Sequence, residues 1–148
     1  MAAAGRARSS TIASRFLDTN VLVYAIDDDE PTRQARALSI IESVPGIELA
    51  VSAQVLGEFF VVATRKLARP RPVAEAGEMV ERLQQLQVVP VDGALVRAAI
   101  AGAAEWGISY WDSLIIRAAE VAGCDVVLSE DLGHGRRYGR VTVEDPFR

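Results

Sequence analysis

Four acidic side chains are the best candidates for chemistry in this sequence, because each lies among apolar neighbours. They are Asp18, Glu58, Asp112 and Asp131. A carboxylate that loses its water without gaining a partner is costly, so buried acids are paired, neutralised or bound to a metal. No Lys or Arg lies within four residues of Glu58 or, on the C-terminal side, of Asp18. We therefore expect the four acids, each near the carboxyl end of a strand, to converge and share divalent cations.

Ligand sets made only of oxygen favour the hard cations Mg²⁺ and Mn²⁺. Two such ions about 4 Å apart activate a water molecule and stabilise the leaving oxygen of a phosphodiester, with no need for a histidine base. The chain has one histidine, His134, and one cysteine, Cys124, which excludes two-histidine and cysteine-rich zinc motifs. We expect His134 in an exposed loop and Cys124 in the core. No phosphate-cradling glycine motif and no nucleophile elbow occurs.

Each acid also has a purely structural interpretation. Taken singly, an acid in such a position is more often a helix cap or a solvated residue. Asp112 fits the N-cap of a helix over residues 113–122, and Glu130 competes with its neighbour Asp131 for the fourth acidic position. The aromatic residues that flank Asp112 are expected to pack in the core rather than to stack on a nucleic-acid base; they are Trp106, Tyr110 and Trp111.

Composition and charge are those of one globular domain. The 148 residues are 50% hydrophobic and 24% charged, which is enough to bury a core. Uncharged stretches are far shorter than the roughly 20 residues that span a membrane, so a transmembrane helix is excluded. The net charge of −4 has the wrong sign for gripping nucleic acid with the whole surface. Phosphates would need metal ions or the basic stretches 65–71 and 136–140, which are equally well explained as solvated faces.

Short apolar runs alternate with longer helical patterns. Strands are predicted up to Leu17 and at 49–51, 88–91, 125–128 and 141–143. Helices are predicted at 31–44, 53–67, 73–87, 93–106 and 111–122, with Ser52 and Asp92 as N-caps. Such alternation predicts an α/β fold with a parallel sheet covered on both faces, and ligands beyond the carboxyl ends of the strands. We expect residues 15–148 to form this single domain and residues 1–14 to be a disordered N-terminal tail.

Four segments resemble the PIN-domain ribonucleases, and among them the VapC-like toxins of type II toxin–antitoxin systems. In chain order they are FLDTNVLVYA at 16–25, SAQVLGEFF at 52–60, SYWDSLI at 109–115 and LSEDLGHG at 128–135. The resemblance covers about residues 15–146. It implies a PIN-like fold with a mainly parallel central sheet flanked by helices. It also implies Mg²⁺-dependent cleavage of single-stranded or loop RNA, with Mn²⁺ as the alternative ion, in a cytoplasmic homodimer inhibited by a cognate antitoxin.

The resemblance also assigns roles by motif position. The catalytic and metal-binding acids would be Asp18, Glu58, Asp112 and Asp131. The supporting polar residues would be Asn20, Ser109 and Ser129. The segment before Phe16 is longer than is usual for these toxins, and the RNA target and the antitoxin cannot be read from this chain.

Two other functions remain open. A non-catalytic PIN-type binding module would be expected to lack one or more of the acids, whereas this chain has all four. A metal-dependent α/β phosphohydrolase typically has an Asp-x-Asp pair, and here Asn20 takes the second position. If an antitoxin binds, we expect a basic residue aimed at the acids and apolar anchors beside it. The helix at 31–44, with Phe59, Phe60 and Val62, is the groove predicted for its amphipathic helix.

Overall fold

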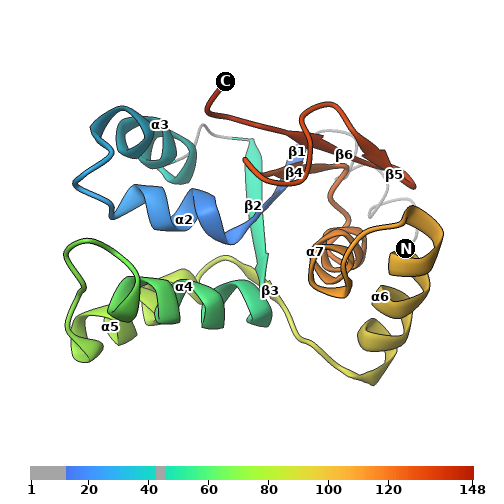
Figure 1. Ribbon diagram of the computed structural model, residues 1–148, viewed down its shortest axis with the longest axis horizontal. Coiled ribbons are helices and arrows are strands. Elements are labelled where there is room, and N and C mark those ends of the chain that lie inside the picture. The colour runs from blue at the N-terminus through green and yellow to red at the C-terminus, as the bar shows by residue number, and fades with distance from the viewer. Residues whose placement is uncertain (1–12, 43–45) are drawn as a thin grey trace.

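The computed structural model describes residues 13–42 and 46–148 (Figure 1). Most of the expected N-terminal tail lies outside the described residues, but Ala13 and Ser14 already belong to the first strand. The described strands are β1 Ala13–Leu17, β2 Ile47–Ser52, β3 Gln87–Val89, β4 Val126–Leu128, β5 Arg137–Tyr138 and β6 Val141–Glu144. The described helices are α2 Thr19–Ala25, α3 Pro31–Ile41, α4 Ala53–Arg65, α5 Val73–Leu83, α6 Gly93–Trp106 and α7 Tyr110–Val121.

The strands form one sheet in the order β3-β2-β1-β4-β6-β5. Every neighbouring pair is parallel except β5 with β6. The predicted α/β class with a mainly parallel sheet is therefore confirmed. The two-residue strand β5 was not predicted; Gly139, with a φ of 60°, makes the tight turn that folds it back on β6.

The register of the central strands sets where the site lies. Leu17 at the end of β1 pairs with Leu128 at the end of β4. The backbone N–H of Asp18 then donates to the Leu128 carbonyl at 3.0 Å, so the chain leaves both strands at the same point. Residues that follow β1 and β4 are thus neighbours beyond one edge of the sheet, as expected for parallel strands.

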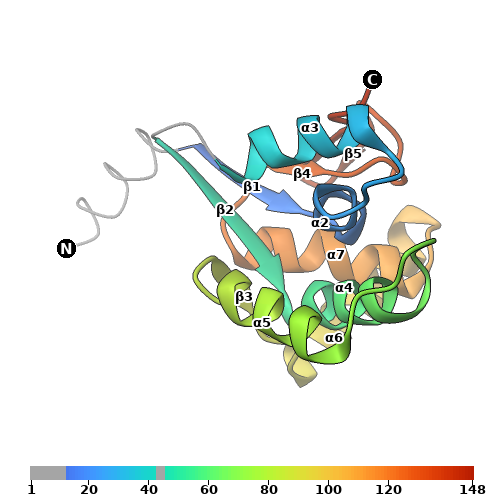
Figure 2. The same ribbon diagram turned by 90° about the vertical axis from the view of Figure 1, so that its left-hand side faces the viewer.

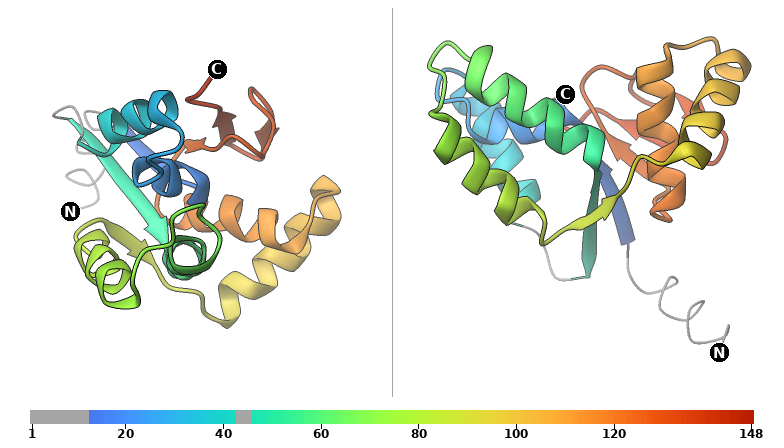
Figure 3. Two further views of the ribbon diagram at one scale, coloured as in Figure 1. Left: turned by 60° about the vertical axis from the view of Figure 1, so that its left-hand side comes forward. Right: turned by 90° about the horizontal axis from the view of Figure 1, so that it is seen from below.

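The helices pack in two groups around this sheet (Figures 1 and 2). In the first group α2 packs on α3 and α4, and α4 packs on α5. In the second, α6 packs along α7, and α7 contacts β2, β4 and β6 (Figure 3). Gly102 permits the close approach of α6 to α7, since a Cβ there would lie 2.5 Å from Ser113 Oγ. No helix in the described ranges is both long enough and apolar enough to cross a membrane.

Side-chain caps explain where three helices begin. The predicted N-caps Ser52 and Asp92 are confirmed, because their side chains accept hydrogen bonds from Val55 N at 3.3 Å and Leu95 N at 2.9 Å. The alternative that Asp112 is an N-cap is wrong. Ser109 caps α7 instead, since its hydroxyl accepts from the N–H of Asp112 at 3.0 Å.

Three helices are shorter than predicted. The pattern at 31–44 ends as helix at Ile41, and residues 43–45 lie outside the described part of the chain. The helix predicted to reach residue 67 ends at Arg65, and the Ala63 carbonyl accepts instead from Arg71 N at 2.8 Å. The helix predicted to reach residue 87 ends at Leu83, because Gln87 pairs with Ala50 as the first residue of β3.

Candidate metal-binding cleft

The four predicted acids line one open cleft of about 450 Å³ beyond the carboxyl ends of β1 and β4. The cleft is formed by α2, α4, the first turn of α7 and the loop after β4. Its lining residues are Asp18, Thr19, Asn20, Val23, Tyr24, Gln54, Glu58, Val62, Trp111, Asp112, Ile115, Glu130 and Asp131. Five of these residues are acids and none is basic. The predicted supporting residues Ser109 and Ser129 are not part of the lining. Ser109 accepts a hydrogen bond from the backbone of Asp112, and Ser129 donates one to the side chain of Asp18.

Asp18 lies at the centre of the site. It follows β1 directly and is the N-cap of α2, because its Oδ1 accepts from Thr19 N at 2.8 Å. Its Oδ2 accepts from the Ser129 hydroxyl at 2.7 Å and from Asn20 Nδ2 at 3.3 Å. Burial raises the pKa of Asp18 to about 6, with the charges of Glu58 and Asp131 raising it further against these hydrogen bonds. Every hydrogen-bond partner named here is neutral, so the negative charge of Asp18 is uncompensated.

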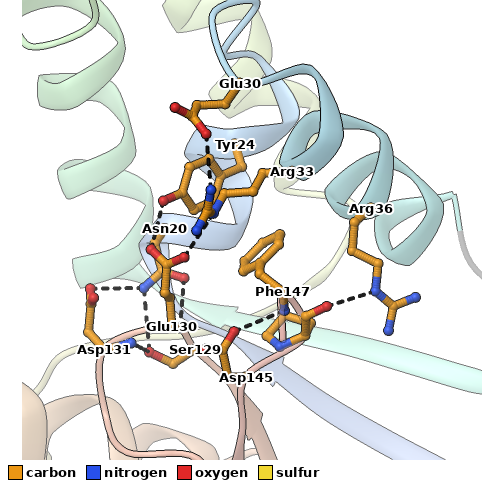
Figure 4. Close-up of polar contacts among 11 residues, drawn as sticks. Asn20, Tyr24, Glu30, Arg33, Arg36, Ser129, Glu130, Asp131, Asp145 and Phe147 are labelled. Carbon is orange, nitrogen blue, oxygen red and sulfur yellow. Dashed lines mark hydrogen bonds and ion pairs between the residues drawn. The ribbon is translucent and has the colours of Figure 1, made fainter.

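Asn20 connects Asp18 to the loop after β4, and Figure 4 shows its contacts with that loop. Its Nδ2 donates to Asp131 Oδ2 at 3.1 Å, and its Oδ1 accepts from Glu130 N at 3.2 Å. The hydroxyl of Ser129 accepts from Asp131 N at 3.1 Å, which shapes the same loop. These neutral groups hold Asp18 and Asp131 close together without supplying a positive charge.

Helices bring the other two acids to the cleft. Glu58 lies on α4, where its Oε1 accepts from the Thr19 hydroxyl at 2.7 Å and its Oε2 accepts weakly from Gln54 Nε2 at 3.4 Å. Asp112 lies in the first turn of α7, and among the described contacts its carboxylate accepts no hydrogen bond. Asp112 does not follow a strand in the chain, because the chain enters α7 from α6, but it lines the same cleft as Asp18 and Asp131.

Glu130 and Asp131 have different surroundings, although they are adjacent in sequence. Glu130 Oε1 accepts from the Tyr24 hydroxyl at 2.6 Å, and Oε2 accepts from Arg33 Nε at 3.0 Å (Figure 4). Burial, followed by the hydrogen bond and charge of Glu130, raises the pKa of Tyr24 to about 12. The ring of Tyr24 also packs edge-on against Phe147 at 4.8 Å. Both carboxylate oxygens of Glu130 are therefore occupied by hydrogen bonds, which leaves Asp131 as the better candidate for the fourth acid.

The basic stretches contribute no residue to the cleft lining. Arg69 pairs with Asp29 at 2.8 Å, and Arg71 pairs with Glu75 at 2.9 Å. In the second stretch Arg136 lies over the ring of Tyr138 at 4.7 Å and donates to a backbone carbonyl. Arg69, Arg71 and Arg136 are thus held by contacts away from the cleft.

The other single residues are placed as predicted. His134 is exposed in a loop, where its Nδ1 accepts from Asp145 N at 3.0 Å. Cys124 is fully buried, and burial raises the pKa of its thiol to about 12. A thiol with so high a pKa is a poor nucleophile, so Cys124 is not a candidate for catalysis.

Sequence reasoning missed several residues of the cleft wall. Thr19 and Gln54 contact Glu58, and the spacing of Gln54 four residues before Glu58 on a helix was the available signal. Trp111 was expected in the core, but its side chain is 62% exposed and lines the cleft. The prediction of core packing fits Trp106 better. The centroid of its ring lies 4.4 Å from Arg117 Cζ and 5.7 Å from the ring centroid of Tyr138.

An apolar groove of about 300 Å³ lies on the other side of α2. Helices α2, α3, α4 and α5 line it, through residues that include Leu22, Leu38, Phe59 and Leu83, with Arg82 as its charged residue. The groove predicted beside the helix at 31–44 is present and includes Phe59, but Phe60 is not among its lining residues. Val62 lines the acidic cleft instead, because it projects from another face of α4.

The donor set of the cleft fits a hard divalent cation. Its acidic ligands offer only oxygen, and Asp18 is a buried carboxylate with like-charged neighbours and neutral partners. In the described residues no three His, Cys, Asp or Glu side chains already converge closely enough to hold an ion by themselves. Mg²⁺ does not require such a cage, because it keeps several waters and takes one or two carboxylates directly. The open volume of the cleft suits a hydrated ion of this kind.

Comparison with known proteins places the chain in a family. Residues 15–139 match the model of the PIN domain. No curated protein sequence matches the chain significantly. Three solved structures with the same fold illustrate the likeness. A toxin–antitoxin complex from Klebsiella pneumoniae aligns with a TM-score of 0.65 at 16% identity, over 89% of this chain and 97% of the other.

The second structure is DNA-bound VapBC from Salmonella typhimurium, with a TM-score of 0.62 at 20% identity, over 91% of this chain and 99% of the other. The third is Mycobacterium tuberculosis VapC20, described as a toxin that cleaves the sarcin–ricin loop, with a TM-score of 0.56 at 21% identity, over 79% and 91%. The family match spans most of the chain, and the strand order and the acidic cleft lie within it. The chain belongs to the PIN domain family.

Proposed function

We propose that this protein is a divalent-metal-dependent endoribonuclease and the toxin of a toxin–antitoxin pair. The observation that carries the proposal is the cleft itself, where four acids from distant segments meet beyond the sheet without a basic residue. Membership of the PIN domain family supports a nuclease. The description of VapC20 as a toxin that cleaves the sarcin–ricin loop supports RNA as the substrate class. A non-catalytic module gains no support, because all four acids are in the cleft.

The chain's own residues have distinct parts in this mechanism. Asp18, Asp131, Glu58 and Asp112 would hold the cation, and the cation, when bound, supplies an activated water and stabilises the leaving oxygen. Asn20 and Ser129 orient Asp18. Thr19 orients Glu58. Without a cation, these carboxylates would repel the phosphates of RNA.

Metal dependence is the direct test. Purified protein should leave single-stranded and loop RNA intact in EDTA and cleave it when Mg²⁺ or Mn²⁺ is added. Asp112→Asn protein, purified in parallel, controls for contaminating nucleases, because the contaminant would persist in that preparation. Undiminished cleavage after exhaustive chelation, or equal cleavage by the variant, would show that the carboxylates are not the catalyst.

The partner we propose is an antitoxin that binds beside the cleft. Solved structures of the same fold are described as toxin–antitoxin complexes, some of them on DNA. The apolar groove beside α2 suits one face of an amphipathic helix, and the neighbouring acids suit an arginine that follows it. The C-terminal half of the antitoxin alone should then inhibit cleavage.

Truncation and charge-swap variants of the antitoxin test this arrangement. Removing its basic residues should relieve inhibition while the apolar anchors still bind. Tight binding that leaves cleavage intact would rule out blocking of the cleft. The resemblance also implies a homodimer, which sedimentation of the purified chain tests separately.

A further inference from the structure

Trp111 is an exposed aromatic ring in the wall of the acidic cleft. Its side chain is 62% exposed, and it is the one aromatic residue among the exposed large hydrophobic residues of the described chain. The ring is steadied by an edge-on contact with Tyr110, with centroids 4.9 Å apart and planes at 77°. A ring that is exposed yet fixed in orientation adds little to the core. It is available to a ligand in the cleft.

Gln54 adds an unpaired acceptor to the same wall. Its Nε2 donates to Glu58 Oε2 and to the backbone carbonyl of Trp111, both at 3.4 Å. Both partners are acceptors, so the amide nitrogen must face them, and this fixes which atom is the oxygen. That oxygen, Gln54 Oε1, is buried and has no hydrogen-bond partner. Both hydrogen bonds of the amide are long, and a rotation of the amide is what would bring the buried Oε1 to a donor in the cleft.

The chemistry of this wall selects its ligand. Carboxylates beside Trp111 disfavour an anion such as a phosphate, whereas they favour N–H donors. A nucleobase is uncharged, has a flat face for stacking on an indole ring, and carries amino or imino N–H groups on its edge. The cleft that would cut a phosphodiester and the ring that would stack a base are contiguous.

Building on the proposed function, we propose that Trp111 and Gln54 form a nucleobase subsite. A base next to the scissile phosphate stacks on the Trp111 ring, and one of its N–H groups donates to Gln54 Oε1. Trp111 thereby positions unpaired RNA, and Gln54 strengthens the binding of bases that have an N–H donor within reach of Oε1. Single strands and loops offer unstacked bases that are free to stack on a protein ring, so the subsite favours them over duplexes.

Kinetics of RNA cleavage give the first test. Trp111→Ala should raise KM about 5- to 150-fold, the usual range for losing one stacked base, while kcat changes little. Trp111→Phe should recover part of the loss. Ile100→Ala is the matched control, because Ile100 is 59% exposed and outside the cleft lining, and its KM should be unchanged. An unchanged KM in Trp111→Ala overturns the subsite.

Fluorescence gives a readout that does not depend on cleavage. Trp106→Phe leaves Trp111 as the sole tryptophan, and Asp112→Asn in the same chain prevents cleavage in Mg²⁺. Titration with a six-residue oligoadenylate should quench Trp111, and an oligomer with abasic sites should not. Equal effects of both oligomers overturn the stacking. The wild type should bind an oligomer with adenine more tightly than one with purine, because purine lacks the amino group that would donate to Gln54. Gln54→Met should abolish this preference, and a preserved preference overturns the role of Gln54.

The two proposals fail in different ways. If the wild type cleaves no RNA with any divalent cation, the proposed function fails, while base-dependent quenching would still support the subsite. If the wild type cleaves RNA but Trp111→Ala weakens only inhibition by an antitoxin, the ring contacts protein and the subsite is wrong.

Discussion

The molecule has two clusters of acidic residues, one in the cleft and one in the loop between α2 and α3. In the loop, Asp29 pairs with Arg69 at 2.8 Å, and Glu30 pairs with Arg33 at 3.1 Å. In the cleft, Asp18 has only neutral hydrogen-bond partners. The residue types are the same, so composition alone cannot separate the groups. What separates them is whether a cation is built into the protein.

The two groups also differ in their energetic effect. An exposed ion pair such as Asp29–Arg69 contributes about 0–1 kcal/mol, because water screens it. A buried carboxylate without a cation lowers the stability of the folded protein. The divalent cation proposed above would supply the positive charge that the residues of the cleft lack. The following experiments test whether the groups differ as described.

Asp112→Asn should have the largest effect. It removes a cleft carboxylate that accepts no described hydrogen bond, so cleavage should fall about a thousandfold or more while the melting temperature holds or rises without metal. Asp29→Asn is the matched loop variant and should cleave RNA at the wild-type rate. The measurements are initial cleavage rates in Mg²⁺ and thermal denaturation in EDTA. Unfolding of Asp112→Asn would instead indicate a structural role.

Metal-free protein should lose stability as the pH rises from about 4 to about 6. The pKa of Asp18 is about 6 when folded, against 3.8 for an ordinary Asp, so the folded state binds more protons between these values. The free energy of unfolding therefore falls over this range, by up to about 3 kcal/mol, and changes no further above it. Urea denaturation in EDTA measures this, and Asp18→Asn should flatten the profile relative to the wild type. Parallel profiles would refute the uncompensated charge.

Glu130→Gln should have an intermediate effect. Glu130 is fastened by Tyr24 and Arg33, so its loss should loosen the loop that carries Asp131 and slow cleavage about tenfold. Asp131→Asn should be much more severe and should also weaken the dependence on Mg²⁺. Rates measured over a series of Mg²⁺ concentrations distinguish the two. If the severities are reversed, Glu130 is the fourth acid.

Asp29→Asn and Arg69→Gln should have the smallest effects. Each should change the free energy of unfolding by about 0–1 kcal/mol, because both side chains are well exposed. A double-mutant cycle by urea denaturation at low and high salt measures the coupling, which should shrink with salt. A coupling of several kcal/mol would mean that solvent does not screen the acids of the loop better than those of the cleft.

The sequence predicted the helix starts better than the helix ends. Ser52 and Asp92 cap helices as predicted, because a side chain that accepts from a nearby N–H is a local feature. Gln87 was assigned to a helix and is in a strand, because its pairing with Ala50 is a contact between distant residues. The same limit applies to Trp111, whose exposure depends on how α7 packs on α6 and the sheet.

More of the candidate site than of the detailed fold could be predicted from the sequence. The four acids were recognised from apolar neighbours and motif order, and the cleft brings them together. The choice between Glu130 and Asp131 could not be made from adjacent letters of one sequence. It depends on Tyr24 and Arg33, which reach Glu130 from elements about a hundred residues away in the chain.

The short helix α2 is shared by both binding surfaces of the molecule. One face of it lines the acidic cleft, through Thr19, Asn20, Val23 and Tyr24. The other lines the apolar groove, through Leu22, Ala25 and Ile26. Its N-cap is Asp18, the candidate ligand whose pKa is raised by burial. If the proposed antitoxin binds in the groove and the proposed cation binds in the cleft, a displacement of α2 would couple the two sites, and thermodynamic linkage requires such a coupling to be mutual. Magnesium would then alter the affinity for the antitoxin by the same factor with which the antitoxin alters the affinity for magnesium.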